Sequence, residues 1–409
     1  ILFIHANKDN KYFPFCKCYS QNVCIFAPMI NDREYIPIGL DAKRIVANAT
    51  GLGAYGRTLI NALGTLPGRY RFLLYAPDGG RDNLRRQVKV SEKVEFAYSG
   101  HHLRLFKDLW RSRGVVADAV RDGVRLYHGL SGELPQGLHK AGIRGLMTVH
   151  DLIFMRHPEY YKPVDVWLYK RKFYQSLREC DRIVAISECT KRDILYYSDY
   201  PADRIDVIYQ SCDTRFRDPV SGEKSREVAA RYGLPARYVL NVGTVEERKN
   251  VLLAVRALRK LPADVCLVVV GRHTSYEDDV REWAARNGLA DRVLFFEGVA
   301  NEDLPVFYQR ASAFVYPSRY EGFGIPVIEA IQSGLAVVAA KGSCLEEAGG
   351  PDSYYVDPDD AEGMADALNE ILATGAEERR ARARQYVTRF ENTNVAQQII
   401  GEYDRLMKE

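Results

Sequence analysis

The chain has 409 residues, of which 46% are hydrophobic and 27% are charged. At about 150 residues per domain this length suits two or three domains, and the composition is that of a globular protein, which excludes a small disulfide-stapled module and extended disorder. No apolar run reaches the ~18 residues that a membrane-spanning helix needs, and a net charge of +3 gives no reason to expect a nucleic-acid partner.

Charge is unevenly distributed along the chain. Residues 1–215 contain 33 basic and 23 acidic residues, whereas the rest of the chain contains 24 basic and 31 acidic ones. An excess of positive charge in one half indicates contact with something anionic, such as a lipid surface or a phosphorylated acceptor. A simple drift of surface charge along the chain is the alternative.

Residues 1–28 differ in character from the rest of the chain. They precede the first methionine, Met29, and they lack both the arginine-rich pattern of a transit peptide and the uninterrupted apolar core of a secretory signal. We expect these residues to be a non-native leader. Three of the eight cysteines lie in it (Cys16, Cys18 and Cys24), and because the eight form no CxxC pair we expect reduced thiols of a cytosolic protein.

From about residue 35 onward, short apolar runs alternate with helical patterns. The runs of the first half are rich in Val, Ile, Leu and aromatic residues and lie at 35–41, 71–77, 94–98, 125–129, 145–151, 182–187 and 205–210. Such alternation of strands and helices predicts a parallel sheet that is covered by helices on both faces.

Polar features come after several of these strands. In TGLGAYGR, Gly51 and Gly53 allow a close backbone approach before a helix, although no GK[ST] follows, so this is not a Walker loop. His150 and Asp151 end the run GLMTVHD, where a histidine beside a substrate could donate a hydrogen bond or stabilise developing charge. A structural histidine at a strand end is the alternative, and for His128 in YHGLSGELP a structural and an acceptor-binding role stay equally open.

The segment HHLRLFKDLW, residues 101–110, alternates basic residues with leucine, phenylalanine and tryptophan. As an amphipathic helix it could rest on an anionic membrane. A helix that packs on the first sheet is the favoured interpretation.

The strand pattern stops between residue 212 and about residue 237 and then resumes. Further apolar runs lie at 238–244, 265–271, 292–298, 312–318 and 335–340. We therefore predict an α/β protein with two doubly wound domains, at 29–215 and 216–385, and a last helix at 386–409 that packs back across the hinge. Ligands of such sheets bind at the carboxyl ends of the strands.

The segment NVGTVEERKN, residues 241–250, places charge at one such strand end. The strand ends at Gly243, Thr244 comes next, and Arg248 and Lys249 come shortly after. Fixed cations at this position would stabilise the negative charge that develops on a departing diphosphate. A solvated basic pair before a helix is the alternative.

The most informative segment is YPSRYEGFGIPVIEAIQSG, residues 316–334. A strand ends at Ser318, a loop with Gly322 comes next, and Pro326 suits the first turn of a helix. The backbone N–H groups of Gly324 and Ile325 are therefore expected at a helix start, where they and the helix dipole form a seat for phosphate oxygens.

Two carboxylates bracket this anion seat. Glu321 precedes it and Glu329 lies about one turn into the helix. Carboxylates in these places suit hydroxyl donors, such as a sugar and a ribose on either side of a diphosphate. The alternatives are a favourable first-turn acid for Glu329 and a solvated loop residue for Glu321.

The segment at residues 316–334 resembles the signature of the retaining nucleotide-sugar glycosyltransferases of the GT-B fold, family 4 (glycosyl transferases group 1). The resemblance extends from about residue 36 to the C-terminus. It implies two Rossmann-like domains that face each other across a cleft, with the acceptor on the N-terminal side and the nucleotide sugar on the C-terminal side. It also implies that Glu321 contacts hydroxyls of the transferred sugar, that Glu329 holds the ribose hydroxyls, and that the backbone from Gly322 through Phe323 and Gly324 to Ile325 holds the diphosphate.

The resemblance also assigns residues outside this segment. It makes Lys249 the phosphate-binding lysine, places Gly53 over the donor diphosphate and the acceptor, and places His150 and Asp151 in the cleft. Many family members carry an arginine directly after the glycine at 243, where this chain has Thr244. Whether Arg248 takes over that task is left open.

The implied activity is transfer of a sugar from GDP-mannose or a UDP-sugar to a hydroxyl of a saccharide or lipid-linked acceptor. The implied mechanism retains the anomeric configuration by front-face displacement and requires no metal or other cofactor, and no DxD ends a strand of the first domain. We expect a mannosyltransferase-like enzyme of polysaccharide biosynthesis in the cytoplasm, with peripheral contact to the inner face of the membrane through its basic N-terminal half.

Other classes remain as alternatives. A non-catalytic nucleotide-sugar-binding protein needs the donor half alone. A dinucleotide-dependent oxidoreductase predicts GxGxxG directly after the first strand, which this sequence lacks. A phosphorylase-like enzyme would need a cofactor lysine that this sequence does not mark.

Overall fold

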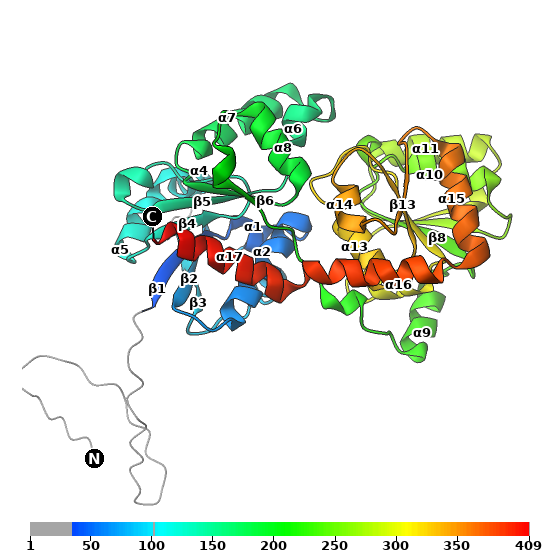
Figure 1. Ribbon diagram of the computed structural model, residues 1–409, viewed down its shortest axis with the longest axis horizontal. Coiled ribbons are helices and arrows are strands. Elements are labelled where there is room, and N and C mark those ends of the chain that lie inside the picture. Colours follow the sequence, from blue (N-terminus) through cyan, green and yellow to red (C-terminus); the bar gives the residue numbers. More distant parts are fainter. Residues whose placement is uncertain (1–34, 101–102, 409) are drawn as a thin grey trace, which may run out of the picture. The chain divides into compact units, whose positions relative to one another are not determined.

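A computed structural model describes residues 35–100 and 103–408 of the chain (Figure 1). The expected leader, residues 1–28, lies outside the described residues, as do Cys16, Cys18 and Cys24. Both sheets of the fold lie within residues 36–409.

The first sheet has seven strands, all parallel, in the order β3-β2-β1-β4-β5-β6-β7. Its strands are β1 (Ile36–Asp41), β2 (Tyr70–Ala76), β3 (Val94–Tyr98), β4 (Leu126–Gly129), β5 (Arg144–Val149), β6 (Arg182–Ala185) and β7 (Ile205–Val207). The strand order reverses between β1 and β4. In a doubly wound sheet this reversal opens a crevice at the carboxyl ends of the two strands.

Helices cover both faces of this sheet (Figure 1). They are α1 (Lys43–Ala47), α2 (Gly51–Thr65), α3 (Asp82–Arg85), α4 (Arg104–Leu109), α5 (Val115–Arg121), α6 (Ile153–Arg156), α7 (Pro163–Leu177) and α8 (Glu188–Tyr197). A π-helical turn, Trp110–Gly114, joins α4 to α5. Ser187 caps α8 by accepting the N–H of Thr190 at 3.0 Å, as expected for a serine at this position.

The second sheet has six parallel strands in the order β10-β9-β8-β11-β12-β13. Its strands are β8 (Tyr238–Val242), β9 (Cys266–Val270), β10 (Val293–Phe296), β11 (Ala313–Tyr316), β12 (Val337–Ala340) and β13 (Tyr354–Val356). The order reverses between β8 and β11. Helices again cover both faces, and they are α9 (Gly222–Tyr232), α10 (Val251–Ala257), α11 (Ser275–Arg286), α12 (Leu304–Arg310), α13 (Ile325–Gln332), α14 (Leu345–Gly349) and α15 (Ala361–Thr374).

The end of the chain is divided into two helices, α16 (Glu377–Tyr386) and α17 (Asn392–Leu406), with a short 3-10 turn between them. The apolar stripe of α17 packs against α2 and the first sheet, where Ile399 and Tyr403 are fully buried. A buried ion pair at 3.0 Å joins Glu402 of this helix to Arg182 of β6. The last helix therefore completes the core of the N-terminal half.

The segment around α4 is more exposed than the favoured interpretation of residues 101–110 implied. Trp110 is buried, but Leu103, Leu105, Phe106 and Leu109 expose between 48% and 76% of their surface. The bulky Trp110 enters the core while the apolar residues before it do not, and ion pairs join Lys107 to Asp78 and Asp108 to Lys43. None of the helices formed by residues 35–100 and 103–408 is both long and apolar enough to span a membrane.

Candidate active site

The candidate site lies where β8 and β11 end side by side in the second sheet. The loop after β8 runs through Gly243 and Thr244 into a 3-10 turn, Glu247–Lys249. Asn250 ends this turn in the left-handed region (φ 55°), and its side-chain amide donates to the carbonyl oxygens of Pro317 at 3.2 Å and Pro358 at 2.7 Å. The two loops are thereby fastened together, and Lys249 is held facing the loop after β11.

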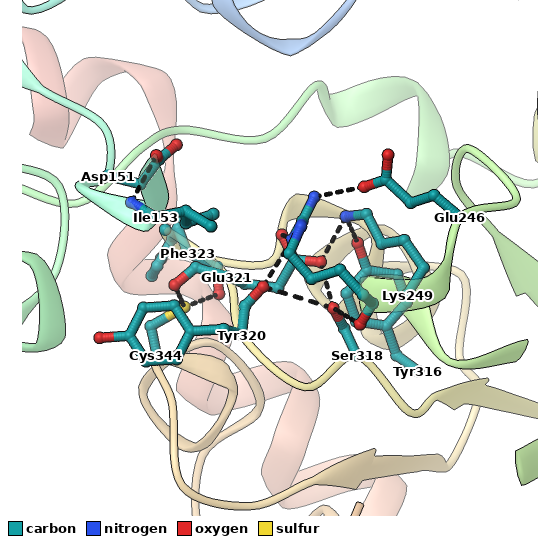
Figure 2. Close-up of polar contacts among 12 residues, drawn as sticks. Asp151, Ile153, Glu246, Lys249, Tyr316, Ser318, Tyr320, Glu321, Phe323 and Cys344 are labelled. Carbon is teal, nitrogen blue, oxygen red and sulfur yellow. Dashed lines mark hydrogen bonds and ion pairs between the residues drawn. The ribbon is translucent and has the colours of Figure 1, made fainter. Parts of the chain in front are cut away.

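Lys249 and Arg248 converge on one carboxylate, that of Glu321. Figure 2 shows Lys249 beside Glu321 and Tyr316. Lys249 donates to Oε1 of Glu321 and, at 2.8 Å, to the hydroxyl of Tyr316. Arg248 lies 3.1 Å from Oε2 of Glu321, and the Ser318 hydroxyl donates to Oε1 at 2.6 Å. The structure thus brings together the three charged residues that the sequence placed at two different strand ends.

The electrostatics of this cluster hold Glu321 in its ionised form. Burial alone would raise the pKa of Glu321, but the charges of Lys249 and Arg248 outweigh that effect and lower the pKa to about 2. The same carboxylate raises the pKa of Lys249 against the opposing effect of burial. Both ionised forms are therefore stable at neutral pH.

Arg248 is not a solvated surface residue. Its side chain is 13% exposed, and it donates to the Tyr320 carbonyl at 2.5 Å and to Glu246 at 2.6 Å besides its ion pair with Glu321. Thr244, the residue directly after Gly243, is half-buried. Arg248 is thus the second cation of the site.

The loop before α13 lies where the anion seat was expected. Gly324 has φ 122°, which disfavours any residue with a side chain, and α13 begins at Ile325 with a proline in its first turn. Phe323 is buried and stacks on Tyr209 with ring centroids 5.3 Å apart. A Cβ at Gly322 would lie only 2.2 Å from the carbonyl oxygen of His150, so only glycine permits this approach.

Glu329 lies on α13 and is partly buried. The Tyr308 hydroxyl donates to its Oε2 at 2.7 Å. Burial raises the pKa of Glu329 to about 7, and the Tyr308 hydrogen bond offsets only part of this rise. Glu329 is therefore an acid that titrates near neutral pH, in contrast to Glu321.

His150 is buried with both ring nitrogens occupied. Its Nε2 lies 2.8 Å from the Leu130 carbonyl oxygen and must donate to it, so Nδ1 accepts from the Gln210 side-chain amide at 2.6 Å. Burial lowers the pKa of His150 to about 4. The ring is neutral at physiological pH and oriented by these two contacts.

Asp151 and His128 differ in their hydrogen-bond partners. Asp151 accepts the N–H of Ile153 at 3.1 Å, as Figure 2 shows, and burial raises its pKa while the nearby Arg248 opposes the rise. His128 is fully buried, with its nitrogens 2.8 Å from the hydroxyls of Tyr403 and Thr148. These contacts favour the structural role for His128 over acceptor binding.

The Gly-rich loop of the first half opens α2. Gly51 is its first residue and is exposed, whereas a Cβ at Gly53 would lie 1.9 Å from the Asn48 carbonyl oxygen. Gly53 thus allows α2 to pack against the loop that precedes it, and this structural requirement exists whether or not a ligand binds there.

Several residues of the site were missed at the sequence level. Tyr316, Ser318 and Glu246 lie inside the two motifs and could have been included as polar neighbours of their charged residues. Tyr308 and Gln210 lie in other segments, and no local pattern indicates that they contact Glu329 and His150. Within the described residues, no group of three or more His, Cys, Asp or Glu side chains is arranged to hold a metal ion.

Family models and a curated relative match this chain. The model of Glycosyl transferases group 1 matches residues 227–390, and that of Glycosyltransferase Family 4 matches residues 49–216. The O-antigen chain mannosyltransferase B of Escherichia coli is 30% identical over 376 residues, which are 87% of this chain and 96% of that protein. The chain belongs to the group 1 glycosyl transferases.

Solved structures share the fold of this glycosyltransferase. Sucrose-phosphate synthase from Thermosynechococcus elongatus has a TM-score of 0.73 at 22% identity, with 91% of this chain and 99% of that chain covered. Anabaena HepE in complex with UDP and glucose has a TM-score of 0.69 at 18% identity, with 90% and 99% covered. The family and the GT-B fold, with two Rossmann-like sheets of parallel strands, are confirmed.

Proposed function

We propose that this glycosyltransferase transfers mannose from GDP-mannose to a hydroxyl of a saccharide or lipid-linked saccharide, with retention of configuration and without a metal ion. Mannose is supported by the Escherichia coli relative, which is an O-antigen chain mannosyltransferase and is matched over 96% of its length. A growing polysaccharide chain is the corresponding acceptor.

The observation that carries the proposal is the ionised Glu321 between Lys249 and Arg248, directly before the N-terminus of α13. The N–H groups at this helix start and the two cations suit a diphosphate. Glu321 suits the hydroxyls of the transferred sugar, and Glu329, on the same helix, suits the ribose hydroxyls.

The proposed chemistry is a front-face displacement at the anomeric carbon. The bond between the anomeric carbon and the diphosphate oxygen breaks, and its electron pair stays on the diphosphate. The acceptor oxygen then bonds to the same face of the sugar, and its proton passes to the departing phosphate oxygen. Lys249 and Arg248 stabilise the charge that develops on the leaving group, which is where fixed cations act most strongly.

Glu321 is poorly suited to form a covalent intermediate. Both of its oxygens are paired with cations, and Oε1 also accepts from Ser318. A carboxylate so engaged is a weak nucleophile, which supports front-face displacement over a double displacement through Glu321. In this proposal Lys249 and Arg248 donate hydrogen bonds to the diphosphate in place of a metal ion.

An amphipathic surface near the acceptor side supports a lipid-linked acceptor. Leu105 and Leu109 of α4 and Val164 and Trp167 of α7 are exposed, and Arg171 lies over the Trp167 ring. Apolar side chains among basic ones suit the interface of an anionic bilayer. Co-sedimentation with phosphatidylglycerol vesicles tests this part, and binding that Trp167→Ser does not weaken would contradict it.

The donor proposal is tested by nucleotide release. The protein is incubated with a mannose-containing acceptor and, in turn, GDP-mannose, UDP-glucose and UDP-galactose. We expect acceptor-dependent release of GDP, and at least a 100-fold loss in Glu321→Gln. Release from a UDP-sugar alone would contradict the proposed donor, and full activity of Glu321→Gln would contradict the proposed site.

A further inference from the structure

Two cavities lie in the N-terminal half, at the carboxyl ends of its strands. The first, of about 240 Å³, is lined by His150 and Asp151, and the charges of Arg248, Glu321 and Lys249 act on Asp151. The second, of about 450 Å³, is lined by Asp41, the last residue of β1, and by Arg111. It occupies the crevice between β1 and β4, where the strand order reverses and ligands of doubly wound sheets bind.

The two cavities share a wall. Glu133 and Lys172, an ion pair at 3.2 Å, line both of them. An acceptor sugar whose hydroxyl reaches the reaction centre would occupy the first cavity. A ligand that fills both cavities must therefore be longer than one sugar.

The second cavity is a rigid polar site. Arg111 reaches Asp41 and Glu133, each at 2.5 Å, and its side chain is only 14% exposed. Burial would raise the pKa of Glu133, but Arg111 and Lys172 lower it to about 2. Glu133 is therefore ionised at neutral pH, and the ion pairs of Arg111 hold the polar groups in place before any ligand arrives, which favours tight and specific hydrogen bonding.

The charges lining the second cavity are balanced. Three cationic and three anionic side chains line it, namely Lys43, Arg111, Lys172, Asp41, Asp108 and Glu133. The first cavity also balances, with Arg44 and Lys172 against Glu133 and Asp151, since His150 is neutral. The hydroxyls of an uncharged polyol both donate and accept hydrogen bonds, so such a ligand can pair with side chains of both signs.

We infer that the second cavity is a subsite for an uncharged sugar of the acceptor, one unit or more behind the residue that receives the transferred sugar. This inference rests on the proposed function, and it makes the glycosyltransferase an elongating one that selects acceptors by the sugars behind their reactive end. Asp41, Arg111 and Glu133 are the residues that determine this specificity.

The test measures saccharide binding directly, by calorimetry and ligand-observed NMR. The probes are methyl α-mannoside, α-linked mannobiose and α-linked mannotriose. We expect the Kd of mannotriose to be at least tenfold lower than that of methyl α-mannoside, because hydrogen bonds to charged groups in the second cavity add about tenfold or more. Equal Kd values for the three probes, or no binding of any, would overturn the inference.

A bulky substitution tests the location. Ser112 lines the second cavity, is exposed and takes no part in the ion pairs of Arg111, so Ser112→Trp places a bulky side chain in the cavity. We expect it to raise the Kd of mannotriose at least tenfold and to leave that of methyl α-mannoside unchanged. Ala117→Trp is the matched control, because Ala117 is exposed on the neighbouring helix α5 and does not line the cavity.

A second variant and the transfer assay distinguish failure of the subsite inference from failure of the proposed function. If Ser112→Trp does not fold, Gln175→Trp obstructs the same cavity from α7. A mannotriose Kd that changes less than twofold in a folded variant would overturn the inference. Mannotriose binding that Ser112→Trp abolishes, in a protein that transfers nothing from GDP-mannose, would instead support the subsite and contradict the proposed function.

Discussion

Lys249→Ala is the substitution to which the proposed chemistry is most sensitive. Lys249 and Arg248 are balanced by Glu321 and Glu246, so the cluster has no net charge when the site is empty. Removing the lysine leaves one negative charge in excess, beside the position proposed for the diphosphate.

The loss of transition-state stabilisation expected for Lys249→Ala can be calculated in two ways. One charge pair about 4 Å apart at an effective dielectric constant of about 20 is worth about 4 kcal/mol. Loss of one preorganised charge-stabilising donor typically lowers the rate by about 10²- to 10³-fold, or about 2.7 to 4 kcal/mol. The two figures agree, and we expect Lys249→Ala to lose at least 100-fold in kcat with a smaller effect on acceptor KM.

The assay is steady-state release of GDP at saturating donor, with circular dichroism and a thermal melt to confirm folding. Lys260→Ala is the matched control, because Lys260 is an exposed lysine of the same half and is paired with Glu362. It should leave turnover unchanged. A kcat for folded Lys249→Ala within threefold of the unmodified protein would refute the assignment of this loop to the leaving group.

Other measurements test other parts of the site. Because the pKa of Glu329 is raised to about 7, the carboxylate that can accept hydrogen bonds from ribose forms as pH rises, and GDP affinity measured by calorimetry should increase from pH 6 to pH 8. Glu329→Ala should bind GDP about tenfold more weakly and show no such increase. A matching pH dependence in the variant would contradict the ribose assignment. Because the pKa of Glu321 is depressed to about 2 from 4.5, the stability that its ionised form contributes is present above pH 4.5 and is lost as pH falls through 2. Between pH 5.5 and pH 3.5 the free energy of unfolding measured in urea should therefore fall by about 1 kcal/mol more in the unmodified protein than in Glu321→Gln. Activity should survive EDTA, whereas complete loss that Mg²⁺ or Mn²⁺ restores would contradict metal independence. Arg248→Ala should lose turnover comparably to Lys249→Ala, and a loss below threefold would show that Arg248 does not replace the arginine absent at Thr244.

The arrangement of strands was largely predictable from the sequence. Runs such as VCLVVVG and SAFVYPS are continuous in Val, Ile, Leu and aromatic residues, as strands buried on both faces must be, and each contains a parallel strand. The α4 segment was harder to predict, because its alternation of basic and apolar residues fits a packed helix and an exposed one equally. Only the tertiary contact of Trp110 shows which end enters the core.

The charged residues of the site were predictable, but their partners were not. Local motifs placed Lys249 and Glu321 at strand ends, and adjacency of β8 and β11 brings these residues together across 72 positions of sequence. By contrast, the neutral tautomer of His150 depends on Gln210 and Leu130, and the raised pKa of Glu329 depends on its burial beside Tyr308. These properties arise from packing between distant segments, for which no local pattern exists.

The most direct test of the proposed function is the anomeric configuration of the first product. GDP-mannose, whose mannose is α-linked, is incubated with an α-linked mannobiose acceptor, and the new anomeric proton and carbon are followed by NMR from the earliest turnover. The front-face mechanism supported by the Lys249, Arg248 and Glu321 cluster predicts a new α-mannosidic linkage together with release of GDP. A β-linkage, or transfer from a UDP-sugar with none from GDP-mannose, would contradict it.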